Sequence, residues 1–145
     1  MKYTCPLCSL DPLSHSLTEV FEKDNTIYYY TCPSKAKLYF DLFGILKHYD
    51  GVLSEIPENK RWLWIFDATD FNLKHFLQIE LAFELSKLIS SKFSEKLVKI
   101  IIINPTFYIS STYHIIYPFL NEKIKSIVEM NDHYKSVNDI IDNIK

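Results

Sequence analysis

Glycine is scarce in this 145-residue chain, which has only Gly44 and Gly51. Neither lies in a Walker or dinucleotide-binding fingerprint, because those motifs need two or three glycines at fixed offsets. An excess of one charge is also missing, since 16 Lys and Arg residues nearly balance 18 Asp and Glu residues. The formal net charge of −2 gives no field that would draw a nucleic-acid backbone to the protein. The composition therefore argues against a nucleotide loop and against a nucleic-acid partner.

Long hydrophobic runs and secretion signals are missing as well. The longest apolar run, Leu97–Ile103, is interrupted by Lys99, whereas a membrane-spanning helix needs about 20 apolar residues. The N-terminus shows no signal-peptide core. Three cysteines, an odd number, do not suggest a secreted disulfide scaffold. We therefore expect a cytoplasmic protein.

Hydrophobic residues, by contrast, make up 48% of the chain, a fraction too high for a disordered protein. The length is that of one globular domain. Strand patterns alternate with helical ones from residue 27 onward: strands at 27–31, 62–66, 97–103 and 126–130, and helices at 38–49, 74–93, 110–120 and from 136. Such alternation predicts an α/β fold with a mainly parallel β-sheet flanked by helices.

The first 25 residues read as turns without periodicity, so we expect an N-terminal cysteine-containing segment at 1–25 and an α/β domain at 26–145. Cys5 and Cys8 have the C-x-x-C spacing that lets two thiolates chelate one tetrahedral zinc ion, as in a zinc knuckle. His15 and Cys32 are the candidates for the third and fourth ligands. The usual second pair of ligands at short spacing is missing, so structural zinc and plain buried thiols both stay open.

Catalytic motifs are not evident. Asp67 and Asp70 follow a strand, but their spacing misses the two aspartates of haloacid dehalogenase phosphatases, and turn hydrogen bonds account for them better. No pair of histidines has metal-ligand spacing among His15, His48, His75, His114 and His133. No nucleophile elbow is present either. We expect no catalytic residues and no enzyme, with a phosphatase or hydrolase at Asp67 as the weakest alternative.

From Arg61 onward the sequence resembles the CRAL-TRIO lipid-binding domain. The residues that carry the likeness are Trp62–Asp67, a long helix, Leu97–Phe107, Tyr113–Leu120 and Lys125–Ile127. The resemblance implies a sheet floor and helical walls around an apolar cavity, closed by a mobile gate helix. A cysteine segment stands where this family commonly has a helical bundle, so the resemblance implies a short, divergent member.

The resemblance places the gate at Phe107–Leu120 and implies a lipid or another small lipophilic ligand, with peripheral contact to a membrane. The implied pocket residues are Phe107, Tyr108, Ile109, Tyr113, Ile116, Tyr117, Phe119, Leu120 and Trp64. Lipid transfer or sensing without catalysis is the implied function. Short, divergent members of the family also look like protein-interaction modules of the GTPase-regulator type, and a protein partner without lipid cargo is the alternative.

Overall fold

The computed structural model describes residues 5–11 and 14–144 and contains one five-stranded sheet in the order β1-β2-β3-β4-β5. The strands are β1 (Thr18–Lys23), β2 (Thr26–Thr31), β3 (Arg61–Asp67), β4 (Leu97–Ile103) and β5 (Val128–Asn131). β1 pairs antiparallel with β2, and every later pair is parallel. The expected mainly parallel α/β sheet is confirmed.

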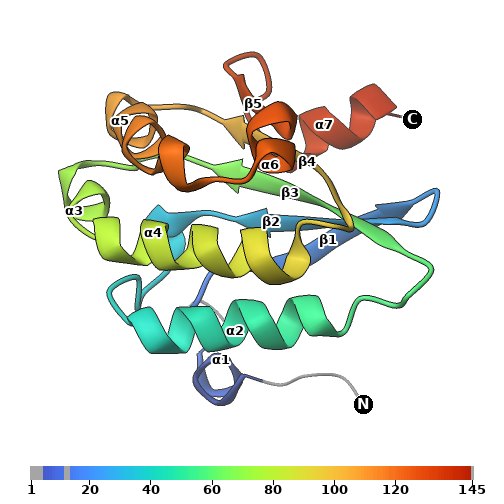
Figure 1. Ribbon diagram of the computed structural model, residues 1–145, viewed down its shortest axis with the longest axis horizontal. Coiled ribbons are helices and arrows are strands. Elements are labelled where there is room, and N and C mark those ends of the chain that lie inside the picture. Colours follow the sequence, from blue (N-terminus) through green and yellow to red (C-terminus); the bar gives the residue numbers. More distant parts are fainter. Residues whose placement is uncertain (1–4, 12–13, 145) are drawn as a thin grey trace.

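Seven α-helices surround the sheet in the described residues (Figure 1): α1 (Pro6–Leu10), α2 (Leu42–Ser54), α3 (Leu73–Phe76), α4 (Ile79–Leu88), α5 (Phe107–Ile116), α6 (Glu122–Ile127) and α7 (Val137–Ile144). Short 3-10 turns occur at Pro33–Lys35 and Tyr117–Phe119. The parallel strands follow one another in chain order, so right-handed crossovers place their connecting helices on one face of the sheet.

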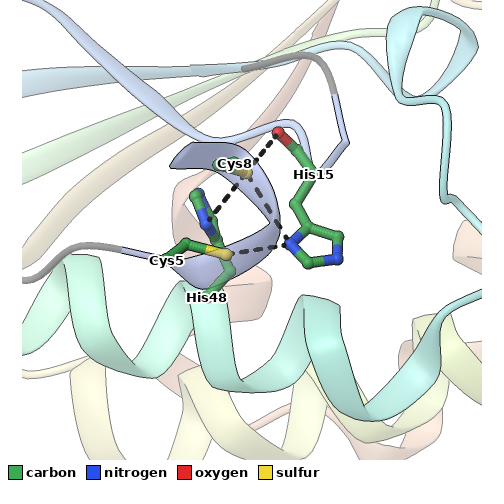
Figure 2. A group of neighbouring side chains, drawn as sticks. All are labelled: Cys5, Cys8, His15 and His48. Atoms are coloured by element: carbon green, nitrogen blue, oxygen red, sulfur yellow. Dashed lines mark hydrogen bonds between the residues drawn. The ribbon is translucent and has the colours of Figure 1, made fainter. Parts of the chain in front are cut away.

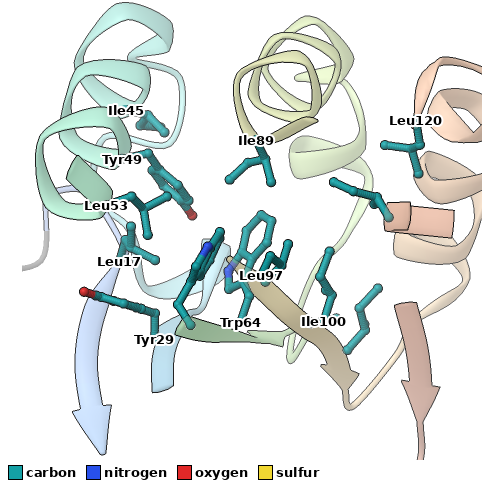
Figure 3. Close-up of a cluster of buried hydrophobic side chains, with 14 of the residues drawn as sticks. Leu17, Tyr29, Ile45, Tyr49, Leu53, Trp64, Ile89, Leu97, Ile100 and Leu120 are labelled. Atoms are coloured by element: carbon teal, nitrogen blue, oxygen red, sulfur yellow. The ribbon is translucent and has the colours of Figure 1, made fainter. Parts of the chain in front are cut away.

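The two faces of the sheet are covered very differently. One face packs Tyr29, Trp62, Trp64 and Ile100 against α2, α4, α5 and α6 in the larger hydrophobic cluster, part of which Figure 3 shows. The other face carries a smaller cluster, including Leu63, Ile65 and Ile101, that packs against Ile140 of α7. The larger part of the hydrophobic core therefore lies between the sheet and the helices of the first face.

Aspartate and asparagine occupy the left-handed backbone positions in the described residues. Asp24, Asn25, Asp70 and Asn104 have φ between 50° and 63°, and no glycine has a positive φ. These two residue types tolerate the left-handed region better than other non-glycine residues. Asp24 and Asn25 form the two-residue turn between β1 and β2, where both positions need positive φ. The fold thus makes its tight turns without the glycine that the sequence lacks.

Several element bounds differ from the sequence-based expectations: the helices expected at 38–49 and 110–120 run over Leu42–Ser54 and Phe107–Ile116. Residues 18–23 form a strand, although only turns were expected up to residue 25. Of the two segments expected at 1–25 and 26–145, residues 1–4, 12–13 and 145 lie outside the described residues. The helix expected at 74–93 is interrupted at Gln78, whose backbone is not helical, and ends in a π-helical turn at Ile89–Phe93. Residues 126–127 end α6, so the strand expected at 126–130 begins at Val128.

The π-helical turn has a clear packing role. A π turn shifts the backbone hydrogen bonds by one residue. In this turn, the carbonyl oxygen of Phe93 accepts a hydrogen bond of 2.9 Å from the indole Nε1–H of Trp62. Because Trp62 is fully buried, this bond supplies a partner for the only polar atom of its side chain.

Candidate functional site

An apolar cavity of about 120 Å³ lies between the sheet and its helical layer. The sheet contributes Trp64 and Phe66 from β3 and Ile100 and Ile102 from β4. The helical layer contributes the following lining residues: Ile45 and Tyr49 from α2, Leu81, Ala82, Leu85 and Ser86 from α4, Ile89, Ile109, Thr112, Tyr113 and Ile116 from α5, Leu120, and Ile124 from α6. Hydrophobic side chains therefore dominate the lining.

Most of the polar atoms in the cavity wall bind one another. The Trp64 indole donates to the Thr31 hydroxyl at 3.1 Å, and this hydroxyl lies 2.9 Å from the hydroxyl of Tyr49. Tyr49 in turn donates to the carbonyl oxygen of Ser16 at 3.5 Å. The hydroxyls of Ser86 and Thr112 donate to carbonyl oxygens of their own helices. The wall therefore presents few unsatisfied polar atoms to a ligand.

Two tyrosine hydroxyls of the lining differ from these wall groups in their hydrogen bonding. Tyr39 and Tyr113 make aromatic ring contacts, but within residues 5–11 and 14–144 their hydroxyls have no hydrogen-bond partner. Burial raises the pKa of both side chains, so each hydroxyl keeps its proton at neutral pH. These two groups are available to bind the polar end of an otherwise apolar ligand.

The pocket residues implied by the family resemblance divide into two groups. Five of them line the cavity: Trp64, Ile109, Tyr113, Ile116 and Leu120. The other four, Phe107, Tyr108, Tyr117 and Phe119, are not among the lining residues. Phe107 is 78% exposed and Phe119 is 59% exposed. Figure 1 shows α5 at one end of the helical layer, where one of its sides faces outward.

Sequence reasoning missed the contributions of α2 and α4 to the lining. Leu81 and Leu85 of α4 and Ile89 of the π-helical turn line the cavity. Their spacing of four residues places them on one side of this segment, the side that faces the cavity.

A second site consists of Cys5, Cys8, His15 and His48, here called the Cys/His cluster (Figure 2). One ligand-type atom from each residue lies within 4.8 Å of the other three. The Nδ1 atom of His15 is 3.4 Å from the Cys5 sulfur and 3.8 Å from the Cys8 sulfur. The Nδ1 atom of His48 is 3.7 Å from the Cys8 sulfur. Two sulfurs and two imidazole nitrogens therefore converge on one point.

The far side of each imidazole ring is held by a hydrogen-bond acceptor. The Nε2 atom of His15 lies 3.0 Å from Oδ2 of Asp41, and that of His48 lies 3.0 Å from the carbonyl oxygen of Leu17. Because an acceptor faces each Nε2 atom, each neutral ring carries its proton there and presents the Nδ1 lone pair to the cluster. Burial lowers the pKa of His48, which favours its neutral form. Burial also raises the pKa of the Cys8 thiol, whose sulfur lies 3.9 Å from the His15 carbonyl oxygen.

Three of the four expected metal ligands are therefore brought together, and His48 stands where Cys32 was expected. Cys32 lies elsewhere, fully buried, with its sulfur 3.3 Å from the Ser34 hydroxyl. No short-range spacing signal marks His48, because it lies 33 residues after His15 in the sequence. Only the packing of α1 against α2 brings His48 to the cysteines.

Asp67 lies at the carboxyl end of β3 and is saturated with donors. Its carboxylate accepts hydrogen bonds from the Tyr30 hydroxyl at 2.6 Å, from the backbone N–H and hydroxyl of Thr69, and from the Asn104 amide. Burial acts to raise the pKa of Asp67, but these hydrogen bonds outweigh it and lower the pKa. Asp70 is exposed in a left-handed turn. This geometry supports the turn interpretation of both aspartates.

The fold and the cavity together define an α/β binding domain with its apolar wall on one face of the sheet. The family model of the CRAL/TRIO domain matches residues 38–144, so the chain belongs to this family. Domains of the family are generally non-catalytic and bind lipophilic ligands. No curated protein matches the chain significantly. Across the described residues, none of the helices has the length and apolar character needed to cross a membrane.

Proposed function

We propose that this protein binds a lipid or another small lipophilic molecule in the apolar cavity and catalyses no reaction on it. The observation that carries the proposal is the cavity wall itself, where hydrophobic side chains dominate and most polar atoms bind one another. Burial of apolar surface is worth about 25 cal/mol per Å². A ligand without many polar groups gains this energy without leaving wall atoms unsatisfied.

The size of the cavity favours a slender ligand. Pockets that enclose drug-sized molecules usually measure about 300–1,000 Å³, whereas this cavity measures about 120 Å³. An apolar cavity of about 150 Å³ is enough to bind benzene. A short acyl chain or a small ring fits this scale better than a whole phospholipid, and the hydroxyls of Tyr39 and Tyr113 suit its polar end.

Two aromatic contacts join α5 and the turn that follows it to α3 and α4. Phe76 of α3 lies with its ring centroid 6.0 Å from that of Tyr108, and Phe83 of α4 lies 4.8 Å from Phe119. Separation of these pairs would let α5 and the Tyr117–Phe119 turn move as the gate that the family resemblance implies. The exposed rings of Phe107 and Phe119 would then contact a membrane surface during ligand exchange.

Titration with a fluorescent fatty acid, together with lipid extraction and mass spectrometry of the purified protein, tests the proposal. Ala82, which lines the cavity from α4, provides a matched pair of variants. We expect Ala82→Phe to fill the cavity and to weaken fatty-acid binding by roughly tenfold or more, equivalent to about 1.4 kcal/mol. Ala82→Ser, which leaves the space open, should bind like the wild type.

The same measurements distinguish the lipid proposal from the alternative of a protein-interaction module. Equal binding by the two Ala82 variants, or no binding and no extracted lipid, would overturn the lipid proposal. In that case the exposed Phe119 becomes the test of a protein partner, since Phe119→Ala should weaken that complex.

A further inference from the structure

Helix α1 is a short element that packs against α2 with very little hydrophobic burial. None of its residues is buried, and its apolar side chains Leu7 and Leu10 are exposed. A helix of five residues is not stable by itself in water. The side chains that are buried around it are instead Cys5, Ser14 and His15. The N-terminal segment therefore needs a source of stability other than a hydrophobic core.

The C-x-x-C spacing and the local backbone place both sulfurs on one side of α1. Cys5 is the N-cap residue of the helix, and Cys8 lies in its first turn, after Pro6 at the first helical position. The backbone N–H of Ser9 donates to the carbonyl oxygen of Cys5 at 2.9 Å, which closes this turn. Figure 2 shows the two sulfurs and the two imidazole rings directed toward a common centre.

The spacing of these atoms fits tetrahedral coordination. Zinc–sulfur bonds of about 2.3 Å and zinc–nitrogen bonds of about 2.0–2.1 Å at the tetrahedral angle separate sulfur from nitrogen by about 3.6 Å. Three of the four sulfur–nitrogen distances in the cluster are 3.4, 3.8 and 3.7 Å, and all four ligand-type atoms lie within 4.8 Å of one another. The groups therefore lie at ligand–ligand distances.

The surroundings of the two histidines also fit a metal site. Imidazole ligands usually donate their second N–H to a carboxylate or a backbone carbonyl, which fixes the ring orientation. Asp41 fills this role for His15, and the carbonyl oxygen of Leu17 fills it for His48. Asp41 is also the N-cap of α2, where its other oxygen accepts from the backbone N–H of Gly44.

Gly44 is one of the two glycines in the chain, and the contact between Asp41 and His15 explains why no side chain stands there. A Cβ atom at this position would lie 1.9 Å from Oδ2 of Asp41 and 2.9 Å from Nε2 of His15. Any larger residue would push the carboxylate away from the histidine. The scarce glycine is therefore placed where Asp41 has to reach both the helix N-terminus and His15.

We propose that Cys5, Cys8, His15 and His48 form a structural zinc site that fixes α1 and the following loop to α2. Two thiolates and two imidazoles are a ligand set typical of closed, tetrahedral zinc sites. The site takes its ligands from α1, from the loop before β1 and from α2, so a single ion joins three segments that share little apolar surface. It is separate from the apolar cavity and does not depend on the ligand proposed there.

Elemental analysis of the full chain, purified without a histidine tag, tests the site, and we expect one zinc ion per chain. Cys8→Ser and His48→Gln should lose this zinc. Cys32→Ser is the matched control, because Cys32 is a buried cysteine outside the cluster, and it should retain the zinc. Asp41→Asn keeps a good N-cap residue and should weaken zinc binding by about 10- to 100-fold in a chelator competition.

A second measurement keeps the test informative if a ligand variant fails to fold. Replacement of zinc by Co²⁺ in the wild-type chain should give the visible absorption of a tetrahedral ion with thiolate charge-transfer bands, and circular dichroism should show reversible loss of structure with a chelator. A folded, metal-free wild type that takes up no added zinc overturns the proposal. Retention of zinc by Cys8→Ser, loss of zinc in Cys32→Ser, or a Cys5–Cys8 disulfide in the native chain would overturn it as well.

Discussion

Helix α2 separates two regions that are held together in opposite ways. On one side, Ile45 and Tyr49 belong to the wall of the apolar cavity. On the other, His48 and the N-cap residue Asp41 belong to the Cys/His cluster and its hydrogen bonds. The cavity side depends on many interchangeable hydrophobic contacts, whereas the cluster depends on four side chains at defined distances. Substitutions in the two regions should therefore differ in size and in what they change.

The largest effect on stability is expected from Trp64→Ala on the cavity side. Trp64 is buried, contacts the rings of Tyr49 and Phe66 at centroid distances of 5.9 Å, and donates to Thr31. Truncation of such a side chain costs about 3–5 kcal/mol, which chemical denaturation would measure. The zinc content should not change. Phe107→Ala is the control, because Phe107 is exposed and its truncation should change stability by less than about 0.5 kcal/mol.

The next effect is expected from Gly44→Ala on the cluster side. The added Cβ collides with the Asp41 carboxylate, and overpacking of this kind costs about 1–3 kcal/mol, with about 1 kcal/mol more for the displaced N-cap. Zinc affinity should fall with it, as a competition assay would show. Gly51→Ala in the same helix should instead stabilise the protein by about 0.5–1 kcal/mol. Equal behaviour of the two glycine variants would contradict the assigned role of Gly44.

The cavity and the cluster also differ in how far the sequence could predict them. The strand at Leu97–Ile103 was predicted with its observed bounds, because a continuous apolar run ended by Asn104-Pro105 has few other interpretations. The strand at residues 18–23 was missed, since its Asp24-Asn25 turn lacks the glycine that usually marks a hairpin. Pattern and turn chemistry thus recover buried strands better than edge strands.

The site residues were likewise predicted only where a local sequence pattern groups them. Cys5, Cys8 and His15 could be grouped from local spacing, but His48 could not, because long-range packing brings it to the cysteines. The family resemblance led to Ile109 and Tyr113 in the cavity wall, but it did not distinguish them from Phe107, which lies on the outer side of the same helix. Helical periodicity restricts which residues share a face, while tertiary packing decides which face is covered.

Asp67 is the centre of a second buried polar cluster, and this one needs no metal ion in the proposed scheme. Its carboxylate is satisfied by Tyr30, Thr69 and Asn104 alone. Asp67→Asn places an amide among these donors and should cost about 1–2 kcal/mol with no change in zinc content. Denaturation of the two proteins at neutral pH would measure this difference.

The same carboxylate gives a pH dependence of known sign. The pKa of Asp67 is lowered from its ordinary value of 3.8, so its contribution to stability is present above that value and is lost as the pH falls through the lower, folded-state pKa. The difference in stability between wild type and Asp67→Asn should therefore shrink in acid. A difference that grows as the pH falls would contradict this assignment.

The smallest effect is expected from Tyr49→Phe, and it decides whether the two regions are coupled. The Tyr49 hydroxyl joins Thr31 in the cavity wall to the carbonyl oxygen of Ser16, and Ser16 and Tyr49 directly follow His15 and His48 in the sequence. Loss of this hydroxyl should cost about 0.5–1.5 kcal/mol, whereas Tyr117→Phe at an exposed position should cost less. Tyr49 lines the cavity but contributes no ligand atom to the cluster, so we expect zinc affinity to stay at its wild-type value in Tyr49→Phe. A change in zinc affinity would instead show that the hydrogen bonds across α2 transmit the state of the cluster to the cavity wall, because this substitution touches no metal ligand.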